Sequence, residues 1–329
     1  MVSSKLHRGL KKLTWKMNDS MFFLGLKNIN LNKSFRRIII YHGIVPHTRL
    51  DINARFISTK TFEEHIQFYK HHFHIVSIEE YFSGAHHPTK PTIAITFDDG
   101  YLNNLTEALP ILEKYEVPAT FYITTIQQKG YPILWADALD LFRLTGRDSF
   151  IFEGQSYKKG KHEYINNKGT HLKKLLKSTG WEIKRKFLEV VLRNNSFMEK
   201  ASCRPYYELM TTDDIKQLSA SKYAQIGSHG AYHNCLDVVT KEEAKEELLM
   251  SKEYLQQLIQ KEVSSIAYPD GRYTRSIIEL ANQLGYQTQL AVDYLHKEDF
   301  SDPRIKSRFG VNPFMSFNNQ MQCIINGKY

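Results

Sequence analysis

Short apolar runs alternate with helix-patterned segments along this chain, and this alternation is the feature that most constrains its fold. The runs Arg37–Tyr41, Pro91–Phe97 and Ala119–Thr124 are rich in β-branched and aromatic residues and show no regular change between polar and apolar positions. Strands of this kind are buried on both faces, as in a parallel sheet that helices cover. The sequence therefore predicts an α/β fold.

The alternation resumes towards the C-terminus. Further strands are predicted at Ile75–Ile78, Ala224–Gly227, Ser264–Tyr268 and Thr288–Val292. Helices are predicted at Thr61–Phe73, Asp213–Ser219, Lys241–Lys261 and Ser276–Leu284. The stretch Leu105–Leu112 also has helical spacing, with a kink or a restart at Pro110.

The stretch at about residues 135–207 departs from this alternation. It is rich in lysine, and Leu172, Leu176 and Phe187 belong to apolar patterns with helical spacing. We interpret it as a helical insertion within a catalytic domain that spans residues 37–329, and not as an independent domain.

The N-terminal segment, residues 1–36, carries most of the net charge. The formal charge of the chain is +9, and residues 1–37 hold nine Lys or Arg against one acid, Asp19. Leu6, Leu10, Leu13 and Met17 recur at helical spacing among these charges, which predicts a basic amphipathic helix. Such a helix can lie on an anionic membrane surface; the alternatives are a solvated terminal helix or a segment that docks on a partner. The rest of the chain is nearly neutral, which argues against a nucleic-acid-binding protein.

The remaining compositional signals concern the cellular compartment. No apolar run approaches the roughly 20 residues that span a bilayer, and Met21–Leu26 is too short for the core of a signal peptide. Cys203, Cys235 and Cys323 are widely spaced, so they indicate neither a disulfide framework nor a cysteine metal site. We expect a cytoplasmic protein, peripheral at the inner face of the membrane through its N-terminal helix.

The first chemical motif is Thr96-Phe97-Asp98-Asp99-Gly100-Tyr101, directly after a predicted buried strand. Two adjacent buried acids raise each other's pKa, and a bound cation removes that conflict. One carboxylate can then bind the metal while the other accepts a proton. Gly100 allows a sharp turn there, and α/β folds place their sites at the carboxyl ends of strands. Taken alone, the motif is also a common turn.

The second motif is Ser228-His229-Gly230-Ala231-Tyr232-His233, again after a predicted strand. Two histidines four residues apart lie on one face of a helical turn, a spacing typical of metal ligands. The residue after His229 is glycine, which excludes the HExxH pattern of zinc peptidases. In a chain with 14 histidines this pair alone could equally arise by chance.

Together the two motifs supply one carboxylate and two imidazoles, a set that leaves open positions for water and substrate. A metal held by Asp99, His229 and His233, with Asp98 as the base, suits hydrolysis of an amide or an ester. Non-haem iron oxygenases use the same ligand types. Their ligands typically follow another order on an all-β scaffold, so we regard that class as the weaker alternative.

With a third motif, Ala267-Tyr268-Pro269-Asp270-Gly271, the chain resembles the polysaccharide deacetylase (NodB-homology, carbohydrate esterase family 4-like) family, in the branch with a Tyr-Pro third motif. The third motif alone is an ordinary turn sequence. Flanking matches include Tyr41-His42-Gly43 and Pro118-Ala119-Thr120-Phe121, and the resemblance runs from about residue 37 to about residue 312.

The resemblance implies a distorted (β/α) barrel, a divalent metal and removal of an acyl group from a sugar. Zn²⁺ is the expected metal, with Co²⁺, Ni²⁺, Mn²⁺ or Fe²⁺ as alternatives. Asp98 matches the catalytic base, and Asp99, His229 and His233 match the metal ligands. The backbone N–H of Tyr101 matches the oxyanion donor, and Tyr268 with Pro269 matches one wall of the substrate groove.

Two features of the family are missing from the sequence. The third-motif arginine that holds the base aspartate is replaced by Ala267, and Arg308 is our first candidate to supply its charge, ahead of Arg272 and Arg304. The late histidine that acts as general acid has no clear counterpart, and His42 is the candidate for that role.

We therefore expect a hydrolase that removes an acyl group, most simply N-acetyl, from a sugar in a polysaccharide or glycan precursor. A substrate linked to a lipid or a nucleotide would suit a protein at the membrane face, in the biosynthesis of a cell-surface polysaccharide. The alternative is a carbohydrate-binding pseudo-enzyme of the same fold, which the two missing residues would favour.

Overall fold

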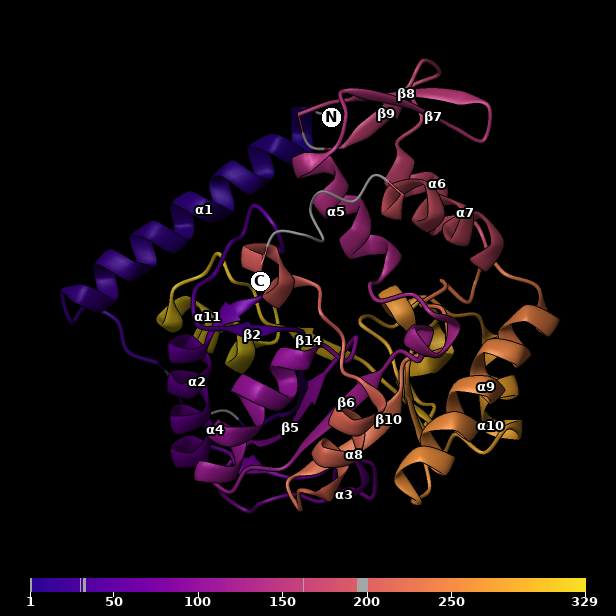
Figure 1. Ribbon diagram of the computed structural model, residues 1–329. Helices are drawn as coiled ribbons and strands as arrows, with labels where there is room; N and C mark the ends of the chain where they lie inside the picture. Colours follow the sequence, from indigo (N-terminus) through magenta and orange to yellow (C-terminus); the bar gives the residue numbers. More distant parts are fainter. Residues whose placement is uncertain (1, 30, 32–33, 162, 194–200) are drawn as a thin grey trace.

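The computed structural model describes residues 2–29, 31, 34–161, 163–193 and 201–329. Its core is a large sheet surrounded by helices (Figure 1). The strands of this sheet are β1 (Arg36–Tyr41), β4 (His74–Ile75), β5 (Thr92–Phe97), β6 (Ala119–Ile123), β10 (Ala224–Ser228), β11 (Ser265–Ala267), β12 (Thr288–Leu290), β13 (Ile305–Lys306) and β14 (Arg308–Gly310). A separate short pair is formed by β2 (Ile44–Val45) and β3 (Ile57–Ser58).

The strand order shows how the large sheet closes. It runs β13-β12-β11-β10-β6-β5-β1-β14, with β4 beside β5, and every pairing is parallel. The two outer strands, β13 and β14, are separated by Ser307 alone, so one stretch of chain pairs with β12 on one side and β1 on the other. The sheet is therefore a distorted parallel barrel, and the predicted α/β fold is confirmed.

The helices follow the strands in the alternation that the sequence predicts. They are α1 (Val2–Phe23), α2 (Thr59–His72), α3 (Ile78–Phe82), α4 (Leu109–Lys114), α5 (Trp135–Thr145), α6 (Leu172–Lys177), α7 (Trp181–Leu192), α8 (Thr212–Ala220), α9 (Lys241–Ile259), α10 (Arg275–Gln283) and α11 (Phe317–Asn326). Short helical turns are η1 (Asn104–Ala108), η2 (Ile126–Lys129), η3 (Ala201–Tyr206), η4 (Pro269–Gly271) and η5 (Lys297–Phe300). Pro110 lies in the first turn of α4, directly after the π-helical η1, where its missing N–H needs no acceptor.

The stretch at about residues 135–207 is only partly helical, which corrects the prediction. Besides α5, α6 and α7 it contains an antiparallel sheet of β7 (Ser149–Phe152), β8 (Gln155–Lys159) and β9 (Tyr164–Asn166). The turn between β7 and β8 is Glu153-Gly154, and both residues have positive φ, 47° and 68°. Two such residues form the tight turn that suits the twist of a hairpin, a signal that the helical interpretation overlooked.

Aromatic rings fill the layer between the barrel strands and α2, just below the ends of the strands. Phe97 stacks on Phe121 with ring centroids 4.8 Å apart and on Tyr41 at 5.4 Å. All three rings are buried and belong to β5, β6 and β1. Dense packing of this kind fixes the strand ends, and with them the residues that follow.

Helix α1 lies beside α11, outside the barrel (Figure 1). Asn319 of α11 donates to the backbone carbonyl of Trp15 (3.1 Å) and to the Asp19 carboxylate (2.7 Å), and Asn18 donates to Asn319 (3.2 Å). In the described part of the chain, no helix is long and apolar enough to cross a membrane.

Candidate active site

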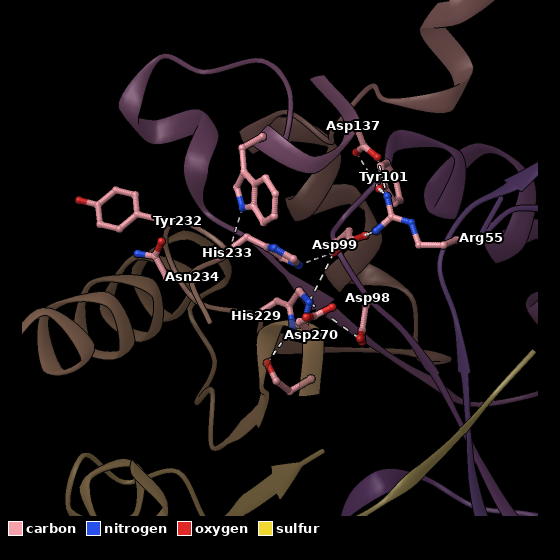
Figure 2. A network of polar contacts seen from close by, with 12 residues as sticks. Arg55, Asp98, Asp99, Tyr101, Asp137, His229, Tyr232, His233, Asn234 and Asp270 are labelled. Carbon is pink, nitrogen blue, oxygen red and sulfur yellow. Dashed lines mark hydrogen bonds and ion pairs between the residues drawn. The ribbon is translucent and has the colours of Figure 1, made fainter. Parts of the chain in front are cut away.

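The two carboxylates after β5 have different main partners: Figure 2 shows Asp99 between Arg55 and the two histidines, and Asp98 forms its ion pair with Arg308. Asp99 and Gly100 both have positive φ, 77° and 82°, so the chain turns sharply at the motif. A left-handed backbone at a non-glycine residue costs roughly 1–3 kcal/mol and persists where the surroundings impose it. The turn directs Asp99 to the histidines, while Asp98 stays against Arg308.

The two histidines lie on a loop after β10, and not on a helical turn as the spacing suggested. Gly230 and His233 have positive φ, 76° and 55°, which a right-handed helix does not allow. These reversals bring the two rings to a centroid distance of 5.0 Å. The pair is therefore produced by loop geometry, at the same end of the barrel as Asp99.

Asp99, His229 and His233 form a compact, buried cluster. Asp99 Oδ1 lies 3.4 Å from His229 Nε2 and 3.2 Å from His233 Nε2, and one ligand atom from each residue lies within 4.8 Å of the others. Nδ1 of His229 donates to the carbonyl oxygen of Ala267 (2.8 Å), because a carbonyl can only accept. Its Nε2 then carries the free lone pair, as in histidines that bind metals.

The donor set therefore fits a divalent cation. Asp99 Oδ1 is buried and has no hydrogen-bond partner among the described residues. A buried carboxylate oxygen without a donor is costly, and a cation between the three side chains would satisfy it. Two imidazoles and one carboxylate suit zinc and other first-row transition metals.

The histidine loop is held by a buried carboxylate that is not part of the cluster. Glu247 of α9 accepts from the backbone N–H groups of Tyr232 and Asn234, both at 3.1 Å, and from the Asn234 side chain at 2.7 Å. Trp135 donates its indole N–H to the backbone carbonyl of His233 (3.0 Å). These contacts flank His233 on both sides and hold its backbone in place.

Asp98 forms a bidentate pair with Arg308. The Nη1–Oδ1 and Nη2–Oδ2 distances are 2.6 and 2.7 Å, and both side chains are buried. Burial disfavours the charged carboxylate, but Arg308 and His229 outweigh it and hold the pKa of Asp98 below its ordinary value. Arg308 thus occupies the place that the missing third-motif arginine leaves.

The two alternative arginines lie elsewhere. Arg272 binds Asp237 at 2.7 Å, and Arg304 binds Asp302 and Glu279, each at 2.8 Å. Both are therefore engaged with other carboxylates, and of the three candidates Arg308 is the one that contacts Asp98.

Sequence reasoning missed a second arginine at the site. Arg55 donates to Asp99 Oδ2 (3.0 Å), to the Tyr101 hydroxyl (2.8 Å) and to Asp137. Tyr101 in turn donates to Asp137 (2.8 Å), and burial raises the pKa of Asp137 to about 7. The network ties the cluster to α5, and no local pattern in the sequence marks Arg55 or Asp137 as partners.

The remaining predicted residues differ in placement. His42 follows β1, and burial lowers its pKa to about 4, so its ring is uncharged at neutral pH.

Tyr268 is fully buried, stacks on Tyr273 and donates to Gln289, and Pro269 is buried as well. Tyr268 is therefore part of the core behind the site, which corrects the expectation that its side chain forms a groove wall. Tyr101 is the residue after the turn, and its role as oxyanion donor stays a prediction.

Comparison with known proteins gives a consistent result. A sequence model described as polysaccharide deacetylase matches residues 85–289. No curated protein sequence matches the chain significantly.

Several solved structures have a similar fold. The Streptococcus pyogenes deacetylase PplD in complex with acetate is 19% identical, covering 87% of this chain and 96% of that one, with a TM-score of 0.57. IcaB from Ammonifex degensii is 15% identical, covering 90% and 97%, with a TM-score of 0.54. The putative polysaccharide deacetylase BA0330 from Bacillus anthracis is 18% identical, covering 88% and 68%, with a TM-score of 0.54. At these identities the likeness concerns the fold.

Proposed function

This chain belongs to the polysaccharide deacetylase family and is a carbohydrate deacetylase, and from that premise we propose that it is a metal-dependent hydrolase that releases acetate from an N-acetylated amino sugar. One observation carries the metal dependence: the buried trio Asp99, His229 and His233 converges around an Asp99 oxygen without a hydrogen-bond donor among the described residues. Asp98 lies beside this trio, with its Oδ2 3.9 Å from His229 Nε2.

The residues around the trio have separate roles in the proposed reaction. A divalent ion held there would polarise the acyl carbonyl and acidify a water molecule for attack. Asp98 is charged at neutral pH and accepts the proton of that water as general base. Arg308 fixes the plane of the Asp98 carboxylate through two hydrogen bonds, so the base keeps one orientation.

The leaving amine must receive a proton. A general acid has to carry that proton at the working pH, and the uncharged His42 is a poor donor in this state. We therefore assign the return of the proton to Asp98, which has just taken it up, and keep His42 as the candidate that a His42→Gln variant tests. A pH profile that loses its basic limb in this variant would return the role to His42.

Two missing residues favour the pseudo-enzyme alternative, the third-motif arginine and the late histidine. The first of them no longer supports it. Arg308, 210 residues away from Asp98 in sequence, forms an ion pair with Asp98, which supports it as the substitute for the missing third-motif arginine. The base therefore keeps the cation that a working site needs.

The proposal is tested by acetate release from N-acetylglucosamine oligosaccharides. Chelation with EDTA should abolish release, and Zn²⁺ or another divalent ion should restore it. Release that persists in metal-free protein would contradict the metal dependence, whereas no release from any acetylated amino sugar would contradict the substrate class.

We also propose that α1 binds the surface of an anionic membrane from the cytoplasmic side. Leu13 and Met17 of α1 are 56% and 59% exposed, and Lys12 and Lys16 beside them are exposed as well. An apolar stripe with flanking lysines complements anionic headgroups and acyl chains. The substrate would then be a glycan precursor at that surface.

A further inference from the structure

A cavity of about 630 Å³ lies between α1 and the end of the barrel. Its barrel side includes His42, which follows β1, and Val311, which follows β14. Strand β5, which leads to Asp98, pairs with β1, so the cavity opens at the same end of the barrel as the candidate site. Its other side is α1, through Lys11, Lys12 and Trp15.

The cavity borders the trio of Asp99, His229 and His233 through Arg55. Arg55 lines the cavity and donates to Asp99 Oδ2 at 3.0 Å. His42, the residue after β1, lines the cavity as well. A sugar whose acyl group lies at the trio would therefore extend its remaining part towards α1.

The charged side chains that line this cavity are all basic. Among its described lining residues, three are Lys or Arg and none is Asp or Glu. Arg55 is already paired with Asp99 and Asp137, so its charge is largely compensated. Lys11 and Lys12 form no ion pair with any described acid. Their ammonium groups are available to an anionic ligand, and the one acid of this helix, Asp19, is engaged with Asn319 and Ser316.

The cavity is held in place by the docking of α1. The backbone carbonyl of Trp15 accepts from the buried side chain of Asn319, so the turn that carries Lys11, Lys12 and Trp15 is fixed against α11. Lys11, Lys12 and Trp15 also lie outside residues 85–289, the part that matches the family, and before residue 37, where the resemblance begins. The family's shared chemistry therefore does not account for the α1 side of this cavity.

We propose that this cavity is a subsite for a phosphate or diphosphate group that the acetylated sugar carries, with Lys11 and Lys12 as its cationic contacts. The inference rests on the proposed deacetylase function and specifies the substrate class. Lysine binds phosphate as a point charge, without the fixed geometry of arginine. Phe314 and Trp15 give the same cavity aromatic walls, which suit a sugar ring or the first part of a carrier.

The test compares charged and neutral substrates in a variant that lacks both ammonium groups. Acetate release is measured with UDP-N-acetylglucosamine, with a farnesyl diphosphate ester of N-acetylglucosamine and with the neutral methyl N-acetylglucosaminide. In Lys11→Ala/Lys12→Ala we expect KM to rise about tenfold for both diphosphates. We expect kcat to stay unchanged, and the neutral substrate to be unaffected. The carrier with the lower KM in the unmodified protein identifies the source of the phosphate.

The matched control is Lys16→Ala, because Lys16 is an exposed lysine of the same helix that is not among the lining residues. An equal rise of KM for all three substrates, or no change for any, would overturn the subsite. Calorimetric binding of UDP-N-acetylglucosamine separates the two proposals. Binding that depends on Lys11 and Lys12 without acetate release from any substrate would refute the deacetylase function and leave the subsite intact.

Discussion

The barrel end and helix α1 are held in place in contrasting ways. At the barrel end, Asp98, Asp99 and His229 are buried and contact residues from distant parts of the chain, such as Arg308 and Arg55. Helix α1 contacts α11 through hydrogen bonds of Trp15, Asn18 and Asp19 with Asn319, and it leaves large apolar side chains in water. Many contacts thus fix the geometry of the candidate active site, whereas few contacts fix the position of α1.

This difference suggests that the two regions have separate functions. A preorganised site needs side chains that cannot relax, because electrostatic stabilisation works only when the charges are already in place. A surface that meets a membrane or a large substrate can be less constrained. Changes at the barrel end should therefore alter the chemical step, and changes on α1 should alter what reaches it.

The largest effect is expected at the trio and the base. His229→Ala removes one of three ligands, so the bound metal and the acetate release should both be lost. Asp98→Asn keeps the ligands and should retain the metal while lowering kcat roughly 100- to 10,000-fold. Metal content is measured by mass spectrometry alongside the kinetics. Loss of metal in Asp98→Asn would show that the two carboxylates are assigned the wrong way round, and retention of metal in His229→Ala would show that His229 is not a ligand.

The next effect concerns the stability of the barrel end. Arg308→Met leaves the Asp98 carboxylate buried without its cation, which should lower the free energy of unfolding by about 3 kcal/mol. The double variant Asp98→Asn/Arg308→Met removes the unpaired charge and should recover most of this loss. Urea unfolding of the four proteins in the cycle measures the coupling. Additive losses would mean that the pair contributes little beyond its separate parts.

Much of this candidate site can be located from the sequence. Its residues are of types that bind metals, and they stand directly after predicted strands, where α/β folds place their sites. An aspartate pair and a histidine pair, each after a buried strand, are brought to one end of a parallel barrel by the topology itself. Arg308 was found by asking which cation could replace a missing one. These inferences depend on short stretches of sequence, where local pattern and tertiary fold point to the same answer.

What could not be predicted depends on tertiary packing. Arg55 lies in a loop and Asp137 in the stretch of about residues 135–207, and their contact spans 82 residues without any periodic signal. The spacing of His229 and His233 predicts a helical turn, because spacing alone cannot reveal a positive φ. The hairpin at Glu153-Gly154 was hidden within a lysine-rich stretch whose flanking segments are helical.

A smaller effect is expected on α1, and it should leave the chemistry untouched. Leu13→Ser/Met17→Ser removes two exposed apolar side chains, so binding to phosphatidylglycerol vesicles should weaken about tenfold. Release of acetate from a soluble substrate should not change. Leu295→Ser is the control, because Leu295 is an exposed leucine of the loop after β12. Equal vesicle binding by the double variant and the unmodified protein would refute the membrane role of this face.

The smallest effect is on the pH dependence of the free energy of unfolding. It tests how tightly the side chains between α2 and the barrel are packed. His65 of α2 is buried against the Tyr41 hydroxyl (3.0 Å), and burial lowers its pKa to about 3. Because the pKa of histidine in the unfolded chain is about 6.5, the unfolded state takes up protons first as the pH falls. The stability from the neutral ring is therefore present above pH 6.5 and is lost progressively towards pH 3. From pH 7 to pH 6 this loss is about 0.7 kcal/mol.

The measurement is the urea midpoint at pH 7 and pH 6 for the unmodified protein and for His65→Gln. The variant cannot bind the extra proton, so its free energy of unfolding should fall by about 0.7 kcal/mol less over this range. His71→Gln is the matched control, because His71 is an exposed residue of the same helix. If His65→Gln and His71→Gln show the same pH dependence, the interior around Tyr41 admits a proton or water more readily than its packing indicates. The contrast between a rigid barrel and an α1 that is held by few contacts would then be weaker than the contacts imply.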